Sequence, residues 1–503
     1  MSQPAETTTQ ARLLLIALLL IVTAGAALRI VKLGTESFWL DEAYSVDVAH
    51  RSLSGIVQEI SRDVHPPLYY FALHDWIEGF GDSEFSARLL SAIFGILAIP
   101  LLYGIGAVLF DRAIGLIAAG FLAWSHFNIE FSQETRMYSL LALLSLASLY
   151  CFVSMLRNPR SILALAGYVV CSSLLLYTHV YAVFTIIAEN LCLLLFLFTS
   201  RQLFRRIFLR WVCAQALVLL LFGPWLSVLW HQIREHRSFW IAPPTLFELQ
   251  YTFLQFAGSV ALLFILVPLA VWALIGLFRR NFAHGQHTAT GSTPDARVAS
   301  LPLTLPGKIS FLVVWLACPV LLPFIASHFV TPFYLAKYTI AASPAFLLLA
   351  AVGLRRLPWK QLQLVMLVAF IILAQRDIFQ YWNRVKKDDW RHAIAFFNQT
   401  AQPRDLVLFT EPAAHLPFDY YSKPTGPGDL IEEPFPDYDH QLTATNVAEL
   451  LRPAIENHQR VWIVLSHQND LSPLVPLQLS QWYEAAAHKT EPGVELYLFE
   501  QRK

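Results

Sequence analysis

The chain of 503 residues is 56% hydrophobic and only 14% charged, and its mean hydropathy is +0.49, which is too apolar for an ordinary water-soluble enzyme. Lysine plus arginine equals aspartate plus glutamate at 36 each, so the formal net charge is zero. No overall positive field exists that would attract nucleic acid. These values predict an integral membrane protein whose surroundings include the lipid bilayer, and they exclude nucleic acid as a partner.

The first predicted element is an apolar segment near the N-terminus. The stretch from Leu13 to Ile30 follows a single arginine, Arg12, and contains a run of small residues, a pattern that cleaved signal peptides also show. We favour an uncleaved anchor, because the stretch is long enough to cross about 30 Å of hydrocarbon and because one arginine is a weak basic flank.

A polar loop at 32–86 follows this anchor and begins with the motif SFWLDEAYSVD. The motif places two adjacent carboxylates, Asp41 and Glu42, among aromatic side chains. An acidic pair just outside a membrane span is usually a solvated loop start or a helix cap. The alternative is an acidic functional site at the bilayer surface.

A second motif in the same loop, DVHPPLYYF at 63–71, carries His65 in front of two prolines. Proline suits the first turn of a helix, and the following leucine, tyrosines and phenylalanine suit a membrane interface. His65 is therefore either part of a site or a turn residue that holds the loop.

Apolar segments of spanning length recur along the chain on a window of about 19 residues. They lie at roughly 11–31, 87–110, 113–131, 137–156, 161–179, 180–199, 208–230, 250–277, 309–328, 338–355 and 361–378. The sequence thus predicts a mainly α-helical, polytopic bundle of about 11 to 13 helices, with interfacial helices in the first loop. The loops LRNPR, SRQLFRRIFLR, LFRRNFAHG and LRRLPWK are basic, so the positive-inside rule places them in the cytoplasm and the other loops outside.

Ionisable and hydroxyl side chains gather in the predicted outward loops. SQETRMYS supplies Glu134, Arg136 and Tyr138, YTHVY supplies His179 and Tyr181, and FYLAKY supplies Lys337 and Tyr338. On a helix, Glu134 and Tyr138 would share one face. Structural alternatives exist for each loop: Glu134 and Arg136 pairing at the membrane surface, Lys337 snorkelling from a helix end, and His179 with Tyr181 as an interfacial anchor.

The character of the chain changes near residue 380. KKDDWRHAIAFFNQT predicts a capped amphipathic helix, and DLVLF, RVWIVLSH and VELYLFE predict short strands. We therefore divide the chain into a transmembrane domain at 1–379 and a small α/β domain at 380–503. An odd number of spans with the first loop outside also places the α/β domain outside.

In order and spacing, these motifs resemble those of a known superfamily. WLDEAYS, then HPPLYY, then FSARLLSAIFGILAIPLLYGIGAVLF and SQETRMYSL are similar to the polyprenyl-phosphate-dependent C-type glycosyltransferases. This superfamily includes the protein O-mannosyltransferases and the lipid A aminoarabinose transferases. The resemblance is strongest over 37–140, and FYLAKY and KDDWRHA are similar to downstream features of bacterial members. The sequence AKY departs from the RY that is more usual in relatives.

The resemblance implies a membrane glycosyltransferase, a hexosyl- or pentosyltransferase, that moves a sugar from a polyprenyl-phosphate donor to an acceptor on the outer face of a bacterial inner membrane, with inversion. Asp41 takes the position of the catalytic aspartate and is expected to be the general base. Glu42 is either a second catalytic residue or a group that positions Asp41. The residues expected to bind the donor phosphate are Arg136, Lys337, Tyr138 and Tyr338, and those expected to line the site are His65, Glu134, His179 and Tyr181.

Cofactor and acceptor stay open at this point. A divalent cation, Mg²⁺ or Mn²⁺, at Asp41, Glu42 and Glu134 is compatible with these side chains, because carboxylate and phosphate oxygens suit hard cations. The five cysteines lack CxxC spacing, so no other cofactor is expected. The acceptor is a protein, a lipid or a polysaccharide. Two alternative functions are a transporter or flippase of lipid-linked sugars and a non-catalytic envelope assembly protein, although ionisable residues at one face favour an enzyme.

Overall fold

The computed structural model describes residues 3–199, 201–235, 241–283, 305–384, 387–422, 429–436, 443, 445–466 and 473–502. The chain divides into two compact units. Unit 1 comprises Met1–Val31, Ser52–Trp76 and Arg88–Asn383, and unit 2 comprises Lys32–Arg51, Ile77–Ala87 and Arg384–Lys503. Two stretches of the long first loop therefore belong with the C-terminal part of the chain.

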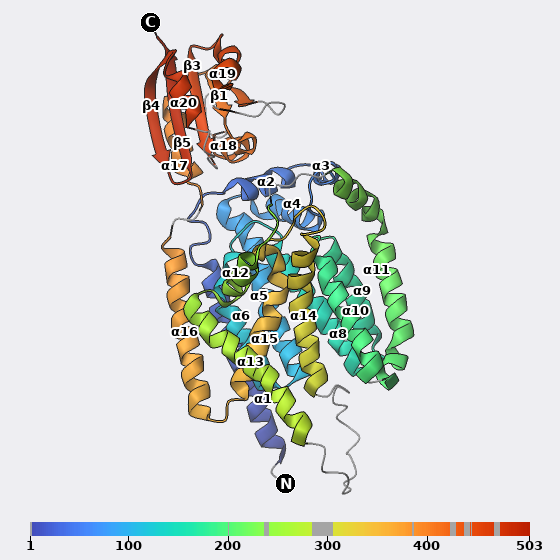
Figure 1. Ribbon diagram of the computed structural model, residues 1–503. Coiled ribbons are helices and arrows are strands. Elements are labelled where there is room, and N and C mark those ends of the chain that lie inside the picture. Colours follow the sequence, from blue (N-terminus) through green and yellow to red (C-terminus); the bar gives the residue numbers. More distant parts are fainter. Residues whose placement is uncertain are drawn as a thin grey trace. The chain divides into compact units, whose positions relative to one another are not determined.

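The part of the chain before residue 384 is helical, and Figure 1 labels most of its elements. In chain order they are α1 (Gln3–Ile30), α2 (Leu40–Ala49), α3 (Leu53–Ile60), α4 (Leu68–Phe80), α5 (Glu84–Leu109), α6 (Arg112–Ala123), α7 (His126–Glu130), α8 (Tyr138–Arg157), α9 (Ile162–Leu176), α10 (Ala182–Thr199), α11 (Arg201–Glu235), α12 (Leu246–Ala257), α13 (Val260–Ala283), α14 (Leu305–Ala326), the 3₁₀ helix η2 (Ala336–Ala342), α15 (Ser343–Arg355) and α16 (Lys360–Trp382). Of these, α2, the last turn of α4 and the first turn of α5 lie in unit 2.

Every predicted membrane segment corresponds to a helix or to a broken pair of helices. Among the described residues, seven helices are long and apolar enough to cross a membrane, three shorter apolar helices occupy further predicted segments, and α12 with α13 forms a pair bent by 91°. The break follows Gly258, whose φ of +95° ends α12 in a conformation that glycine adopts readily. The predicted polytopic helix bundle is confirmed, and the chain is a multi-span membrane protein.

Burial separates the central helices from the peripheral ones. In the span formed by η2 and α15, 94% of the apolar 18-residue stretch is buried. The buried share of the corresponding stretch is 72% in α8 but only 17% in α1 and α16. Large apolar side chains such as Leu19, Leu220 and Ile372 are exposed, as expected of helices that face lipid. The centre of unit 1 is therefore built around α8 and α15.

Unit 2 contains a five-stranded sheet of order β2-β1-β3-β5-β4. Its C-terminal elements are α17 (Trp390–Thr400), β1 (Leu406–Phe409), the 3₁₀ helix η3 (Pro412–Ala414), α18 (His415–Ser422), β2 (Ile431–Pro434), α19 (Val447–Ile455), β3 (Arg460–Ser466), α20 (Leu474–Leu479), β4 (Tyr483–Glu491) and β5 (Val494–Gln501). β1 is parallel to β2 and β3, whereas β5 is antiparallel to β3 and β4.

Alternating side chains of the central strands give this sheet two apolar faces. On one face, Val407 and Trp462 pack with Trp390 and Phe397 of α17 and with α18. On the other face, residues such as Ile463 pack with α19 and α20. The predicted strands are β1, β3 and β5. The edge strands β2 and β4 were not predicted, because IEEP and YEAAAHKTE are mostly exposed and contain few β-branched residues.

Close packing of α13 against α15 gives a test of the bundle. A Cβ on Gly353 would lie 1.8 Å from the backbone oxygen of Leu269, so the two helices would have to separate. We expect Gly353→Ala to lower the free energy of unfolding by about 1–3 kcal/mol, measured by thermal unfolding in detergent. Gly120→Ala is the matched control, because nothing lies within 4 Å of its added Cβ. Equal stability of the two variants would contradict the close approach.

Candidate functional site

Segments that are far apart in the sequence meet in a buried cluster of rings in unit 1, the histidine–tyrosine cluster of His65, Tyr138, His179 and Tyr338. The ring centre of His65 lies 4.9 Å from that of His179 and 6.1 Å from that of Tyr338. The Tyr338 ring lies 4.8 Å from His179 and 6.1 Å from Tyr138. All four side chains are buried. The structure thus brings together residues that the sequence analysis drew from four separate loops.

Local backbone contacts explain this convergence. His65 lies directly before the two prolines that precede α4, and the N–H of Leu68 donates to the C=O of Tyr177 at 3.0 Å, which joins that segment to the turn between α9 and α10. His179 lies in this turn, Tyr138 is the first residue of α8, and Tyr338 lies in η2. Each ring is therefore held at a helix end or in a turn, as binding residues usually are.

Two cations adjoin the cluster. Nζ of Lys337 lies 5.5 Å from the ring centre of Tyr138 and 5.8 Å from that of Tyr338, within the range of cation–π attraction. Arg136 is buried. Burial, followed by the positive charges of Arg136 and Lys337, lowers the pKa of His179 to about 3. Burial, His179 and the same two cations hold the pKa of His65 well below 6.5. The cluster therefore presents neutral imidazoles beside two positive charges.

Hydrogen bonding sets the tautomer of His179. The backbone N–H of Tyr181 donates to Nδ1 of His179 at 3.1 Å, so the proton of the neutral ring is on Nε2. Within the described part of the chain, Nε2 of His179 and Nδ1 of His65 are buried and have no hydrogen-bond partner. Buried polar atoms are nearly always paired in folded proteins. These two nitrogens therefore fit a bound group that forms hydrogen bonds with them.

The two other predicted lining residues are Tyr181 and Glu134. Tyr181 is buried with its ring centre 5.3 Å from that of Tyr338, and its hydroxyl donates to the C=O of Phe333 at 2.9 Å. Glu134 is half-buried in the segment that contains Arg136. Glu134 and Tyr138 do not lie on a common helix, because 131–137 forms turns and bends and α8 begins only at Tyr138.

A buried network holds this non-helical segment. Nε2 of Gln133 donates to the C=O groups of Arg29 and Val31, both at 2.9 Å. The fully buried Arg29 guanidinium in turn donates to the last carbonyls of α6, at 3.1 Å to Ala123 and 3.2 Å to Leu122, where the helix dipole favours a cation. Arg29 was not predicted as a supporting residue. The sequence does indicate it, because an arginine inside a spanning segment usually points into the protein.

Asp41 and Glu42 belong to unit 2, in the first turn of α2, where the helix dipole favours carboxylates. Glu42 is fully buried, and Nζ of Lys387 donates to its Oε2 at 2.9 Å. Asp41 is half-buried. Lys387 was not predicted as a site residue, although it begins the motif KDDWRHA. Asp41 and the histidine–tyrosine cluster lie in different units, so their combination in one site stays a prediction.

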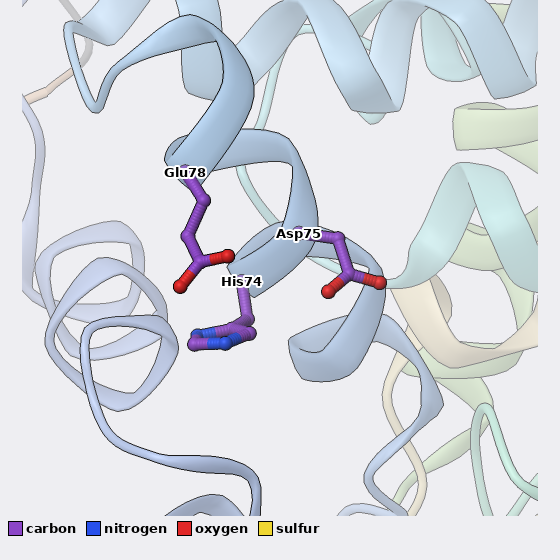
Figure 2. Close-up of side chains that lie close together, drawn as sticks. All are labelled: His74, Asp75 and Glu78. Carbon is purple, nitrogen blue, oxygen red and sulfur yellow. The ribbon is translucent and has the colours of Figure 1, made fainter.

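One group of side chains with metal-ligand atoms close together occurs among the described residues, on α4. His74, Asp75 and Glu78 place such atoms within 4.8 Å of one another (Figure 2). Asp75 and Glu78 are exposed, as surface acids without a metal commonly are, and we assign no ion to them. The divalent cation at Asp41, Glu42 and Glu134 stays a prediction, and Lys387 already supplies a positive charge to Glu42.

The chain is similar to known proteins both in sequence and in fold. Residues 64–228 match the family model described as dolichyl-phosphate-mannose-protein mannosyltransferase. The structure of ArnT from Cupriavidus metallidurans in the apo state has a TM-score of 0.60 and 14% sequence identity, over 95% of this chain and 97% of that chain. The chain shares its fold with this ArnT structure. The resemblance that the motifs indicated is confirmed.

Two further solved structures share this fold. ArnT from Cupriavidus metallidurans bound to undecaprenyl phosphate gives a TM-score of 0.57 at 14% identity, over 95% of this chain and 97% of that chain. The oligosaccharyltransferase AglB from Archaeoglobus fulgidus, in complex with an inhibitory peptide and a dolichol-phosphate, gives 0.53 at 12% identity, over 97% of this chain and 74% of that chain. Comparison with curated proteins gave no significant match.

The lowered pKa values of the two histidines predict how stability depends on pH. An unfolded histidine takes up a proton near pH 6.5, but folded His179 does so only near pH 3. The stability linked to the neutral rings is therefore present above pH 6.5 and is lost as the pH falls, by about 1.4 kcal/mol per pH unit for each histidine.

The measurement is the free energy of unfolding in detergent between about pH 7 and pH 5, the range in which an unfolded histidine becomes protonated. His179→Phe should flatten the dependence, and His328→Gln, at an exposed histidine of unit 1, should not change it. Parallel curves for all three proteins would show that His179 is not held neutral.

Proposed function

We propose that the chain is a membrane glycosyltransferase that moves a sugar from a polyprenyl-phosphate donor to an acceptor hydroxyl, with inversion at the anomeric carbon. The observation that carries the proposal is the histidine–tyrosine cluster with its two cations, together with the buried nitrogens of His65 and His179 that have no hydrogen-bond partner among the described residues. A phosphate matches both features, because it carries negative charge and presents several acceptor oxygens.

Each residue of this site has a distinct part in the proposal. The guanidinium of Arg136 can bind two phosphate oxygens through its planar fork. Lys337 acts as a point charge, with the rings of Tyr138 and Tyr338 beside it. Nε2–H of His179 donates to a further phosphate oxygen, and this hydrogen bond satisfies a buried donor.

The comparisons support a lipid-linked donor. The matching family model is described by a dolichyl-phosphate-mannose donor, ArnT has been solved with undecaprenyl phosphate, and AglB has been solved with a dolichol-phosphate. In this chain the apolar tail of such a donor would stay in the hydrocarbon while its phosphate binds beside Arg136 and Lys337. A non-catalytic assembly protein gives no comparable reason for neutral histidines beside two cations.

The proposed reaction is a single displacement. Asp41 takes the proton of the acceptor hydroxyl as its oxygen attacks the anomeric carbon from the side opposite the phosphate. The bond between the anomeric carbon and the phosphate oxygen breaks, and polyprenyl phosphate leaves with the electron pair. Arg136 and Lys337 stabilise the charge that develops on this leaving group, so the step needs no general acid. The scheme also requires no metal, since these side chains supply the positive charge.

The arginine-rich loops support a location of this site and of unit 2 on the outer face of a bacterial inner membrane, by the positive-inside rule. The acceptor is a protein, a lipid or a polysaccharide with a hydroxyl that can reach Asp41. The identity of the sugar depends on side chains that distant loops bring together around the donor.

The function is tested with purified protein and a panel of polyprenyl-phosphate sugars and acceptors, scored by release of polyprenyl phosphate. Asp41→Asn should lower kcat by about 10²- to 10⁴-fold, because the general base is lost. The affinity of the Asp41→Asn variant for polyprenyl phosphate should equal that of the wild type. Asp47→Asn is the control, because Asp47 lies on the same helix and pairs with Arg51 at 2.9 Å. Undiminished release by Asp41→Asn would remove Asp41 as the base, and a wild-type protein that consumes no donor would contradict the enzyme.

The phosphate site has its own test in binding. Arg136→Gln should raise the dissociation constant for polyprenyl phosphate by about 10- to 100-fold, because charge-assisted hydrogen bonds are lost. Isothermal titration calorimetry in detergent measures this dissociation constant directly and does not require turnover. Arg160→Gln, at an exposed arginine of unit 1, should bind like the wild type. Equal binding by both variants would place the phosphate elsewhere.

A further inference from the structure

The segment that precedes Asp41 is tied to the C-terminal part of the chain within unit 2. Oγ of Ser37 donates to the C=O of Asp388 at 2.9 Å, and the N–H of Phe38 donates to the hydroxyl of Tyr421 at 2.8 Å. The fully buried ring of Phe38 lies edge-on to Tyr420, with 5.0 Å between centres. The backbone that leads into α2 is therefore held by residues 351 and 383 positions later in the chain.

A buried ion pair extends this attachment into α2 itself. The side chain of Glu42 has no exposed surface, that of Lys387 is 11% exposed, and their charged atoms lie 2.9 Å apart. A buried carboxylate is tolerated when a partner compensates its charge, and removing one partner of such a pair is costly. Glu42 is adjacent to Asp41 in the first helical turn. The direction of that turn therefore depends on where Lys387 lies.

Lys387 is itself held by the sheet. The N–H of Asp389 donates to the C=O of Pro492 at 2.8 Å, and Asp389 caps α17, whose Trp390 lies in the core of the unit. Gly493, at φ +75°, allows the turn between β4 and β5 to approach this segment, because a Cβ there would lie 2.0 Å from the carboxylate of Asp388. Contacts thus run from the β4–β5 turn through 388–389 to Lys387, Glu42 and the turn that carries Asp41.

We propose that Lys387 is a positioning residue, and that through its ion pair with Glu42 the α/β domain sets the direction of the Asp41 carboxylate. This inference rests on the proposed function and deepens it. Glu42 then acts by binding Lys387 and does not react with the substrate. The α/β domain becomes part of the catalytic machinery, since a displacement of about 1 Å in a reacting group can cost about 100-fold in rate.

The test uses three variants of the full chain. Lys387→Met keeps the aliphatic stem and removes the charge, Lys387→Arg keeps the charge, and Glu42→Gln/Lys387→Met removes both charges so that none stays buried and unpaired. Lys489→Met is the matched control, because Lys489 lies in the same unit and forms an ion pair with Glu491 at 2.9 Å with its side chain 39% exposed. Thermal unfolding establishes which variants fold, and if Lys387→Met does not, the double variant replaces it.

We expect kcat to fall at least about tenfold in Lys387→Met and in the double variant, because Asp41 is displaced from the acceptor. KM for the donor and the dissociation constant for polyprenyl phosphate should stay within about twofold of the wild type, since the phosphate site lies in unit 1. Lys387→Arg should recover most of the rate, and Lys489→Met should have full activity. A folded Lys387→Met or double variant with wild-type kcat, or one altered only in KM for the donor, would overturn the inference.

This outcome is distinct from failure of the proposed function. If the wild type transfers sugar and Asp41→Asn does not, while the Lys387 variants are fully active, only the positioning role is wrong. If the wild type releases no polyprenyl phosphate from any donor, the proposed function fails, and the inference fails with it.

Discussion

In unit 1, two cationic side chains lie beside two buried imidazoles, and this electrostatic arrangement defines the proposed phosphate site. Arg136 is buried, Lys337 lies over two tyrosine rings, and the neighbouring imidazoles of His65 and His179 are held neutral. A buried cation is costly unless other groups compensate it. A phosphate between these side chains would add negative charge beside both cations, so binding of the proposed donor would also stabilise the folded state of this part of the chain.

Burial also constrains the negative charges of α2, because a buried carboxylate needs a positively charged partner. Glu42 is buried in unit 2 and is neutralised by Lys387, while its neighbour Asp41 is half-buried on another side of the helix. Adjacent residues of a helix point about 100° apart, so one acidic pair serves two purposes. The carboxylate of Glu42 fastens the helix to the α/β domain, and that of Asp41 is the general base of the proposed reaction.

Rigid supports hold the irregular segments that carry these groups. The 131–137 segment is not helical, yet Gln133 bonds to the end of α1, and Arg29 joins that end to the last turn of α6. In unit 2, the β4–β5 turn holds 388–389 in the same way. Binding groups on loops are useful only where a scaffold fixes them, and here helix ends and a sheet turn provide that scaffold.

The sequence by itself determined the membrane helices, the central strands and the likeness to a superfamily. A membrane span needs about 20 apolar residues whatever its neighbours are, because it lies in hydrocarbon. The central strands need apolar residues because helices cover both faces of their sheet and remove it from water. The tertiary structure alone decided that the segment 113–131 breaks between α6 and α7 and that α12 turns away from α13 at Gly258. It also decided that His65, Arg136, His179 and Lys337 meet, and that Glu42 pairs with Lys387, 345 residues away. Hydropathy is a local property that the solvent sets, whereas these contacts depend on the packing and electrostatic energies of the whole folded chain.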